Sequence, residues 1–354
     1  MIDWTDVGLS VLKIVIILAF MLNVTPIMVW VERRGSALIQ DRPGPNRVGP
    51  FGLFQSLADA LKFLMKEDVV PAQAHKWLYT IAPAFGLLPA MTTIAVVPWG
   101  RPFFLRSGRL FEPIVADVNV GLLLIFALAS LSVYGVTMAG WSSANKYSLF
   151  GAIRSSAQMI SYELSLTLAA VSALMVAGSL RLTDVVWRQT GYFVLFDSVK
   201  IPAWNVFSPA MWLSFIVFSV SAFAETNRLP FDFAEAEAEL VAGYHTEYSS
   251  MKFALFFMAE YMAMATMSAL VVTLFLGGWD VPWYNEPPTA FGFAVSALAF
   301  LLKVSFLLFV FVWVRWTIPR LKYDLLMRLG WKVFLPLAFV NIVLVAFFIV
   351  RGWI

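Results

Sequence analysis

Eight stretches of this chain are apolar for long enough to cross a lipid bilayer. A membrane-spanning α-helix needs about 20 consecutive, mainly apolar residues. The windows that meet this condition are residues 7–31, 77–99, 118–139, 159–178, 207–225, 253–276, 291–316 and 333–350. Inside a bilayer only helices and closed barrels satisfy their backbone hydrogen bonds. The pattern therefore predicts an all-α, polytopic integral membrane protein.

The composition supports a single membrane domain over residues 1–354. Charged residues make up 13% of the chain, whereas a soluble domain carries roughly a quarter. The net charge of +3 is small, which gives no case for nucleic-acid binding. The sequence has no internal repeat, so an inverted-repeat transporter architecture is not supported.

The basic residues predict the orientation of the spans, because cytoplasmic loops are enriched in Lys and Arg. Sixteen of the 25 basic residues lie in the loops 32–76, 140–158, 226–252 and 317–332. Seven lie in the opposite set of loops or at the C-terminus, and Lys13 and Lys303 fall inside spans. We therefore expect these four loops to face the cytoplasm and both termini to face outward.

The first cytoplasmic loop contains a short amphipathic segment. Phe54, Leu57, Leu61 and Leu64 recur at helical spacing, with Asp59 and other polar residues between them. The segment is too short and too polar to span, so we expect an interfacial helix along the cytoplasmic face. It is either a plain surface anchor or a lip that guides a lipid-soluble substrate into the protein. The Gly- and Pro-rich stretch before it lacks the Gly-Lys-Ser/Thr ending of a phosphate-binding loop.

Residues 225–249 hold an unusual concentration of acids. The run ETNRLPFDFAEAEAELVAGYHTEYS contains six of the 22 acids of the chain and one base, Arg228. Such a cluster beside a membrane is costly to desolvate. It predicts proton handling, a polar binding chamber or, if solvated, a docking surface.

Three further charges lie inside predicted spans, at Glu163, Glu260 and Lys303. Each would be costly facing lipid and is expected to face other helices or a polar cavity. They form either buried ion pairs or a titratable relay, because burial moves the pKa of such groups towards neutrality.

The chain has no cysteine and only two histidines, His75 and His245, both in predicted loops. A Cys-ligated iron–sulfur cluster and an intramembrane bis-His haem are therefore excluded on this chain. Any redox centre that serves it must sit on a partner.

Several long segments resemble the H subunit of proton-pumping NADH–quinone oxidoreductase, the respiratory complex I family. They are ERRGSALIQDRPGPNRVGPFG, KEDVVPAQAHKWLYTIAP, GWSSANKYSLFGAIRSSAQMISYEL, RLPFDFAEAEAELVAGYHTEYSSMKF, LFLGGW and LKYDLLMRLGWKVFLPL. The resemblance runs from about residue 30 to the C-terminus, and the GPNRVGP and GYHTEYS motifs are highly specific. The outward loops around 100–117 and 180–206 lie outside it.

The resemblance implies a bacterial inner-membrane subunit that carries no haem, flavin, iron–sulfur cluster or metal and no complete active site of its own. Its substrate would be ubiquinone or menaquinone. Its partners would be the lipid bilayer, the hydrophilic quinone-reducing subunits, including the one with the terminal iron–sulfur cluster, and the small and antiporter-like membrane subunits. It would form the chamber in which quinone is reduced and would couple that reaction to proton translocation.

The resemblance also assigns residues. The quinone chamber would use Glu32, Arg33, Arg34, Asp59, Lys62, Arg228, Asp232 and Tyr248. The proton or charge relay would use Glu163, Glu225, Glu235, Glu237, Glu239, Glu260, Lys303 and Arg315. One departure is Ser130, which stands where some members carry a glutamate. The relay then either bypasses this position through water or does not need it.

Two other functions remain open from the sequence. The chain could be the homologous membrane anchor of an energy-converting hydrogenase or of an F420H2-type dehydrogenase. The GPNRVGP segment argues against the hydrogenase. It could also be a stand-alone carrier or an inert scaffold. The missing internal symmetry argues against a carrier, and acids within spans argue against inert packing.

Overall fold

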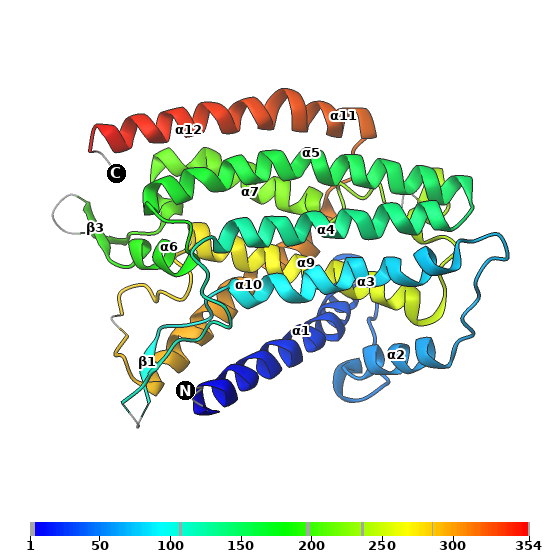
Figure 1. Ribbon diagram of the computed structural model, residues 1–354, viewed down its shortest axis with the longest axis horizontal. Coiled ribbons are helices and arrows are strands. Elements are labelled where there is room, and N and C mark those ends of the chain that lie inside the picture. The colour runs from blue at the N-terminus through cyan, green and yellow to red at the C-terminus, as the bar shows by residue number, and fades with distance from the viewer. Residues whose placement is uncertain (1–3, 106–107, 196–198, 235–236, 285, 353–354) are drawn as a thin grey trace.

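The computed structural model describes residues 4–105, 108–195, 199–234, 237–284 and 286–352, which fold into a bundle of long helices (Figure 1). Within these residues, seven helical stretches are long and apolar enough to cross a membrane. They are Val7–Ile39, Lys76–Val96, Gly121–Ser142, Lys146–Ala177, Ser250–Phe275, Ala290–Thr317 and Tyr323–Val350. A shorter apolar stretch, Pro209–Glu225, covers the expected window 207–225. The all-α, polytopic prediction is confirmed at this level.

The helices follow one another along the chain in an antiparallel manner. The long ones are α1 (Trp4–Ile39), α3 (Lys76–Thr93), α4 (Gly121–Ser142), α5 (Lys146–Ala177), α7 (Trp212–Glu225), α9 (Ser250–Phe275), α10 (Ala290–Thr317) and α12 (Leu335–Val350). Short helices are α2 (Gln55–Met65), α6 (Leu182–Gln189), α8 (Glu237–Leu240) and α11 (Tyr323–Arg328). A π-helical turn, Leu329–Phe334, joins α11 to α12.

α9 forms the centre of the bundle, and α1 and α12 lie at its edges. The most apolar window of α9 is 72% buried, against 22% in the α1 stretch and in the stretch that ends with α12. α9 packs against α3, α10, α1 and α7, while α5 packs against α4, α7 and α12. Polar groups in α9 and in the loops that meet it are therefore held away from lipid.

Small residues allow the closest helix crossings. A Cβ on Gly135 of α4 would lie 2.7 Å from the backbone nitrogen of Gly86 in α3. A Cβ on Gly151 of α5 would lie 2.7 Å from the Cα of Gly243, in the one-turn helix Gly243–His245. Close approach of this kind is the usual mode of helix packing in membranes. It seats the loop that follows α7 directly on α5.

The two ends of the bundle differ. α2 and the start of α11 lie at one end in Figure 1. The opposite end carries α6, the first and last described residues and two small antiparallel hairpins, β1–β2 (Phe103–Phe104 with Leu110–Phe111) and β3–β4 (Tyr192–Leu195 with Val199–Pro202). The first end holds the loops predicted to be cytoplasmic, and the sidedness itself stays a prediction.

Helix bounds differ from the hydropathy windows at two places. α5 begins at Lys146 instead of near residue 159, so most of the segment 140–158 is helical. Its start is capped by Asn145, whose side chain accepts a hydrogen bond from the backbone N–H of Tyr147. α1 continues to Ile39 and so carries Glu32, Arg33 and Arg34 on a helix rather than in a loop. The expected amphipathic helix is present as α2.

Candidate functional site

A cluster of buried charges lies where α1, α9, α10 and the loop after α7 meet. Glu32 of α1 accepts hydrogen bonds from two residues on different helices. Arg315, in the last turn of α10, pairs with its Oε1, and the Tyr261 hydroxyl of α9 donates to its Oε2 at 2.8 Å. Arg228 approaches the same Oε2 at 3.7 Å. Glu32 is thus held by groups from three other parts of the fold.

Arg228 joins Glu32 to Glu260. Its Nη2 lies 3.6 Å from Oε2 of Glu260, and its guanidinium stacks 4.2 Å from the centre of the Tyr261 ring. The Tyr244 hydroxyl lies 3.3 Å from Oε1 of Glu260. Two carboxylates and two guanidinium groups therefore balance in charge. Balance matters here because an isolated charge in such a buried place would be very costly.

A cavity of about 70 Å³ links this cluster to Glu225. It lies among α3, α4, α5, α7 and α9, and both Glu225 and Glu260 line it. Other polar lining residues are Thr93, Ser132, Thr226, Asn227, Tyr244 and Thr266. The volume exceeds the roughly 10–15 Å³ that one water molecule needs, and the two acids on its wall make the cavity a candidate proton path.

Glu225 is buried at the end of α7, and neither of its carboxylate oxygens has a hydrogen-bond partner within the described residues. Glu163 of α5 lies near enough to act on it electrostatically. Glu163 itself accepts a hydrogen bond from the Ser130 hydroxyl of α4. Ser130, which the resemblance places where some family members carry a glutamate, thus contacts Glu163, an acid of the predicted relay.

The loop between α7 and α9 is fastened by buried polar contacts. The Gln158 side-chain amide of α5 donates to the carbonyls of Ala224 and Phe231, each at 2.7 Å. The Tyr248 ring stacks on Tyr79 of α3 with centroids 4.1 Å apart, and its hydroxyl donates to the Tyr79 carbonyl at 3.1 Å. Burial raises the pKa of Tyr248 to about 12. This tyrosine, predicted to belong to the quinone chamber, is engaged with α3.

The acids in the middle of that loop are placed unevenly. Glu239 is exposed and pairs with Arg154 of α5 at 2.6 Å and with Arg320 at 4.0 Å. Asp232 is half-buried. Glu235 and the side chain of Glu237 lie outside the described residues. Glu239 therefore sits at the surface of the site, whereas Glu225 and Glu260 lie within it.

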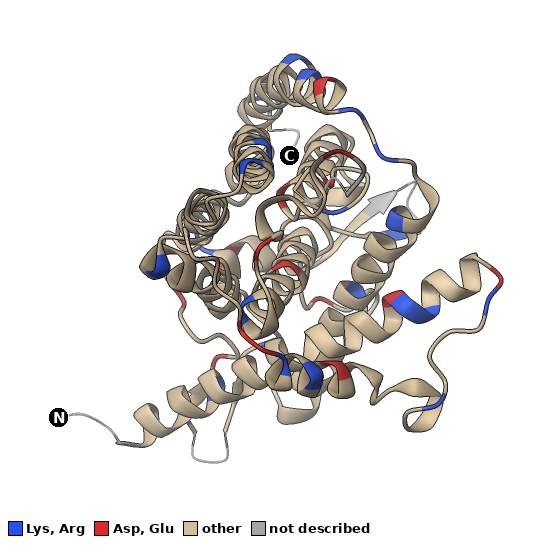
Figure 2. Cartoon of the chain, turned by 90° about the vertical axis from the view of Figure 1, so that its right-hand side faces the viewer, with Lys and Arg blue, Asp and Glu red and all other residues tan. Residues whose placement is uncertain are grey.

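The remaining predicted chamber residues gather around α2. Arg33 pairs with Asp59 at 2.5 Å, and both are partly exposed. Arg34 donates to the Pro45 carbonyl at 3.3 Å, near the rings of Trp30 and Phe51. Lys62 is exposed on α2. Figure 2 looks onto this end of the molecule, with acidic segments among the helix ends near its middle and basic segments both there and around its rim.

Lys303 does not join the central cluster. Its ammonium group donates to the carbonyls of Leu276, Gly278 and Asp280 at 2.7–3.0 Å and lies 3.9 Å from the centre of the Trp204 ring. It caps the C-terminal end of α9, where the helix dipole favours a cation. The structure places this predicted relay residue at the end of the bundle that carries the termini.

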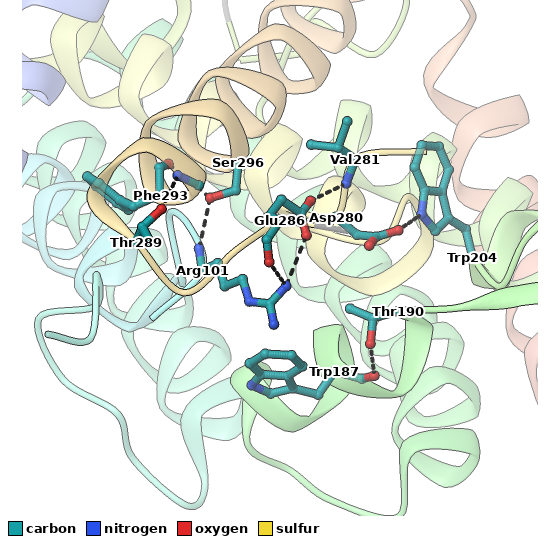
Figure 3. Close-up of polar contacts among 11 residues, drawn as sticks. Arg101, Trp187, Thr190, Trp204, Asp280, Val281, Glu286, Thr289, Phe293 and Ser296 are labelled. Atoms are coloured by element: carbon teal, nitrogen blue, oxygen red, sulfur yellow. Dashed lines mark hydrogen bonds and ion pairs between the residues drawn. The ribbon is translucent and has the colours of Figure 1, made fainter. Parts of the chain in front are cut away.

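A second polar network includes Trp204 and Asp280, two residues that contact Lys303 (Figure 3). The Trp204 indole donates to Asp280 at 2.8 Å, and Arg101 lies 3.4 Å from Glu286. Oε1 of Glu286 also accepts from the Val281 N–H at 2.8 Å. Burial raises the pKa of Asp280, and the hydrogen bond from Trp204 opposes that shift. The partners of these side chains are backbone groups and each other, which is typical of a structural network.

Sequence reasoning missed Tyr244 and Tyr261, which hold Glu260 and Glu32 in place. Tyr261 follows Glu260 directly in an apolar span, and a tyrosine beside an intramembrane acid was the available signal. Asp280, Glu286 and Arg101 were also missed, because short outward loops gave no pattern. Within the described residues, no group of three or more His, Asp and Glu is placed to hold a metal ion.

Comparison with known proteins gives one consistent result. A sequence model of the family described as NADH dehydrogenase matches residues 12–346. An H subunit of NADH-quinone oxidoreductase from Geobacter metallireducens, numbered 1, is 49% identical over 99% of this chain and 97% of its own length. The H subunit of Salinibacter ruber is 48% identical over 97% and 95%, respectively. NADH-quinone oxidoreductase subunit 8 of Rhodothermus marinus is 46% identical over 94% of each chain.

Proposed function

This chain belongs to the family of NADH-quinone oxidoreductase H subunits, and on that premise we propose that its buried charge cluster couples quinone reduction to proton translocation. In this proposal the chain lines the quinone chamber beneath the hydrophilic, quinone-reducing subunits of the complex. The observation that carries it is the arrangement of Glu32, Arg228, Glu260 and Arg315 beside a cavity that reaches Glu225.

The chemistry requires that charge and protons move together. Reduction of a quinone to a quinol takes up two electrons, here from a partner's redox centre, and two protons. Negative charge that develops in the chamber attracts the nearest guanidinium groups and weakens their hold on carboxylates. Arg228 is the group in this position, since it bridges Glu32 and Glu260 at 3.6–3.7 Å.

The residues of the cluster then act in order. When Arg228 moves towards the chamber, Glu260 loses its compensating charge and gains affinity for a proton. Water in the cavity carries that proton from Glu225 to Glu260, and Glu163 then donates a proton to Glu225. Ser130 keeps Glu163 oriented without titrating, which supports the alternative in which a relay acid at this position is not needed.

The test compares Glu225→Gln and Glu260→Gln with the control Glu67→Gln, in the intact complex reconstituted into liposomes. Glu67 is an exposed acid outside the proposed relay. We expect both relay variants to lower the number of protons pumped per NADH oxidised and the control to leave it unchanged. Unchanged turnover and pumping in Glu225→Gln would remove the cavity from the mechanism.

A further inference from the structure

The helix α11 and the π-helical turn after it carry basic side chains that nothing in the described structure neutralises. Lys322, Arg328 and Lys332 are exposed, and none of them makes a hydrogen bond or ion pair with a described residue. The one acid in this segment, Asp324, forms no ion pair with Arg328 one turn later. In Figure 2 the uppermost helix carries basic segments beside an acidic one.

An apolar stripe continues directly from Lys332 along α12. Pro336, Val340, Val343 and Phe347 follow at helical spacing, and all are exposed. The opposite face of α12 is buried against α5 and α7, where the Asn341 amide donates to Ser172 at 3.0 Å and also contacts Ser214. The stripe therefore lies on the outer face of α12, and contacts with α5 and α7 hold the inner face in position.

Trp331 marks the level at which the stripe begins. Its indole N–H donates to the Ser161 hydroxyl of α5 at 3.1 Å, while nearly half of the residue is exposed. Tryptophan in this position is typical of the membrane–water interface. From Lys332 to Val343 the helix rises about 16 Å, close to the roughly 15 Å of hydrocarbon in one leaflet.

We propose that Arg328 and Lys332 bind the phosphate of an anionic phospholipid whose acyl chains lie along the α12 stripe. The two bases are one turn apart, and a guanidinium can hold phosphate oxygens in a bidentate manner. The absence of a paired acid within the described residues favours a lipid with net negative charge over a zwitterionic one. The apolar stripe below the bases favours a lipid over a free phosphate. The site is independent of the quinone chamber and of the relay.

The experiment uses the whole complex in nanodiscs that contain phosphatidylcholine and a photoreactive phosphatidylglycerol. Cross-linked peptides are mapped by mass spectrometry, and unlabelled phosphatidylglycerol, phosphatidylcholine or inorganic phosphate is added as competitor. We expect cross-links in residues 328–347, and we expect only unlabelled phosphatidylglycerol to suppress their formation. The double variant R328Q/K332Q should lower this cross-linking by roughly 25-fold at low probe content, since each base near the surface contributes about a fivefold effect.

Two further variants separate charge from fold. R328K/K332R keeps both charges and should retain the competition, and K146Q removes an exposed base at the same end, on α5, and should not affect it. Equal displacement by inorganic phosphate would mean a site for free anions and would overturn the proposal. So would unchanged cross-linking in R328Q/K332Q, or cross-links from this segment to a neighbouring subunit in place of lipid.

Discussion

At the scale of single residues, burial decides what the loss of an arginine costs. Arg33 and Arg228 both lie near carboxylates, yet the side chain of Arg33 is 48% exposed and that of Arg228 only 6%. An exposed ion pair contributes about 0.2–1 kcal/mol. Removal of one partner from a buried pair costs about 3–5 kcal/mol, because it leaves an uncompensated charge behind.

We therefore expect Arg228→Gln to lower the thermal stability of the assembled complex far more than Arg33→Gln. The same ordering should appear in the amount of complex recovered from membranes. A combined variant, Arg228→Gln with Glu260→Gln, removes both charges of one pair and should recover part of the loss. Equal stability of the two single variants would contradict the view that the Arg228 cluster is desolvated.

His245 gives a prediction on pH. It is buried among the rings of Tyr244, Phe253 and Phe257, and burial lowers its pKa from 6.5 to about 4. A lowered histidine pKa means that the unfolded chain binds the proton more tightly than the folded one. The contribution of the neutral imidazole to the free energy of unfolding is therefore fully present above pH 6.5 and is lost as the pH falls towards 4. The full loss is about 3 kcal/mol.

Replacement of His245 by Phe should remove this part of the acid destabilisation. Melting midpoints of the purified complex at pH 7.5 and pH 5 would measure it, and the variant should show the smaller decrease. His75→Phe serves as the control, because His75 is exposed and is the only other histidine of the chain. An identical decrease in the His245 variant would show that this imidazole is not desolvated.

The sequence identified the acids of the site but not their pairing. Glu32 and Arg315 are 283 positions apart, and no periodicity within one element can predict such a contact. Glu32 and Arg228 were assigned to the chamber and Glu260 and Arg315 to the relay, whereas all four lie in one cluster. Lys303, which was assigned to the relay, lies against carbonyls that follow the end of α9, and its position within a span could not predict these contacts.

At the scale of elements, hydropathy predicts where a helix crosses lipid and not where it begins. The first three turns of α5 are too polar for a span, yet Ser148 donates to the Tyr244 carbonyl, and Gln158 in the following turn donates to the carbonyls of Ala224 and Phe231. The bounds of α5 depend on tertiary contacts for this reason. The loop after α7 is ordered in the same way, by contacts with α5 and α3 rather than by its own sequence.

The contact between Gly151 and Gly243 tests this element directly. In Gly151→Ala the new methyl group would lie 2.7–2.8 Å from backbone atoms of Gly243 and Tyr244, which cannot move aside as a side chain can. The loop should lift from α5, and Tyr244 should then lose its contact with Glu260. We expect faster hydrogen exchange at residues 240–249 and reduced quinone turnover.

Gly8→Ala is the matched control. Gly8 lies in α1, and no atom would come within 4 Å of its Cβ. The substitution should be neutral or stabilise the helix by up to about 1 kcal/mol. Unchanged exchange in Gly151→Ala would mean that the loop is not seated on α5 in the assembled complex.

At the scale of the whole molecule, the number of crossings and the position of the termini depend on each other. Seven crossings would leave the two termini at opposite ends of the bundle, and eight would bring them to the same end. The described chain starts and finishes at the end that carries α6 and the hairpins (Figure 1). We therefore expect the short helix α7 to act as the eighth crossing, which agrees with the orientation expected from the basic residues.

Single cysteines can test this expectation, because the chain has none of its own. Arg188→Cys and Val241→Cys flank α7 at exposed positions, and Arg351→Cys and Lys66→Cys mark the two ends of the bundle. Membrane vesicles of both orientations are stripped of peripheral subunits and treated with a thiol reagent that does not cross the membrane. The labelled peptides of this chain are then identified by mass spectrometry. Positions 188 and 351 should react from the outer side, and positions 66 and 241 from the cytoplasmic side. Reaction of positions 188 and 241 from the same side would show that α7 does not cross the membrane, and it would overturn the arrangement with eight crossings.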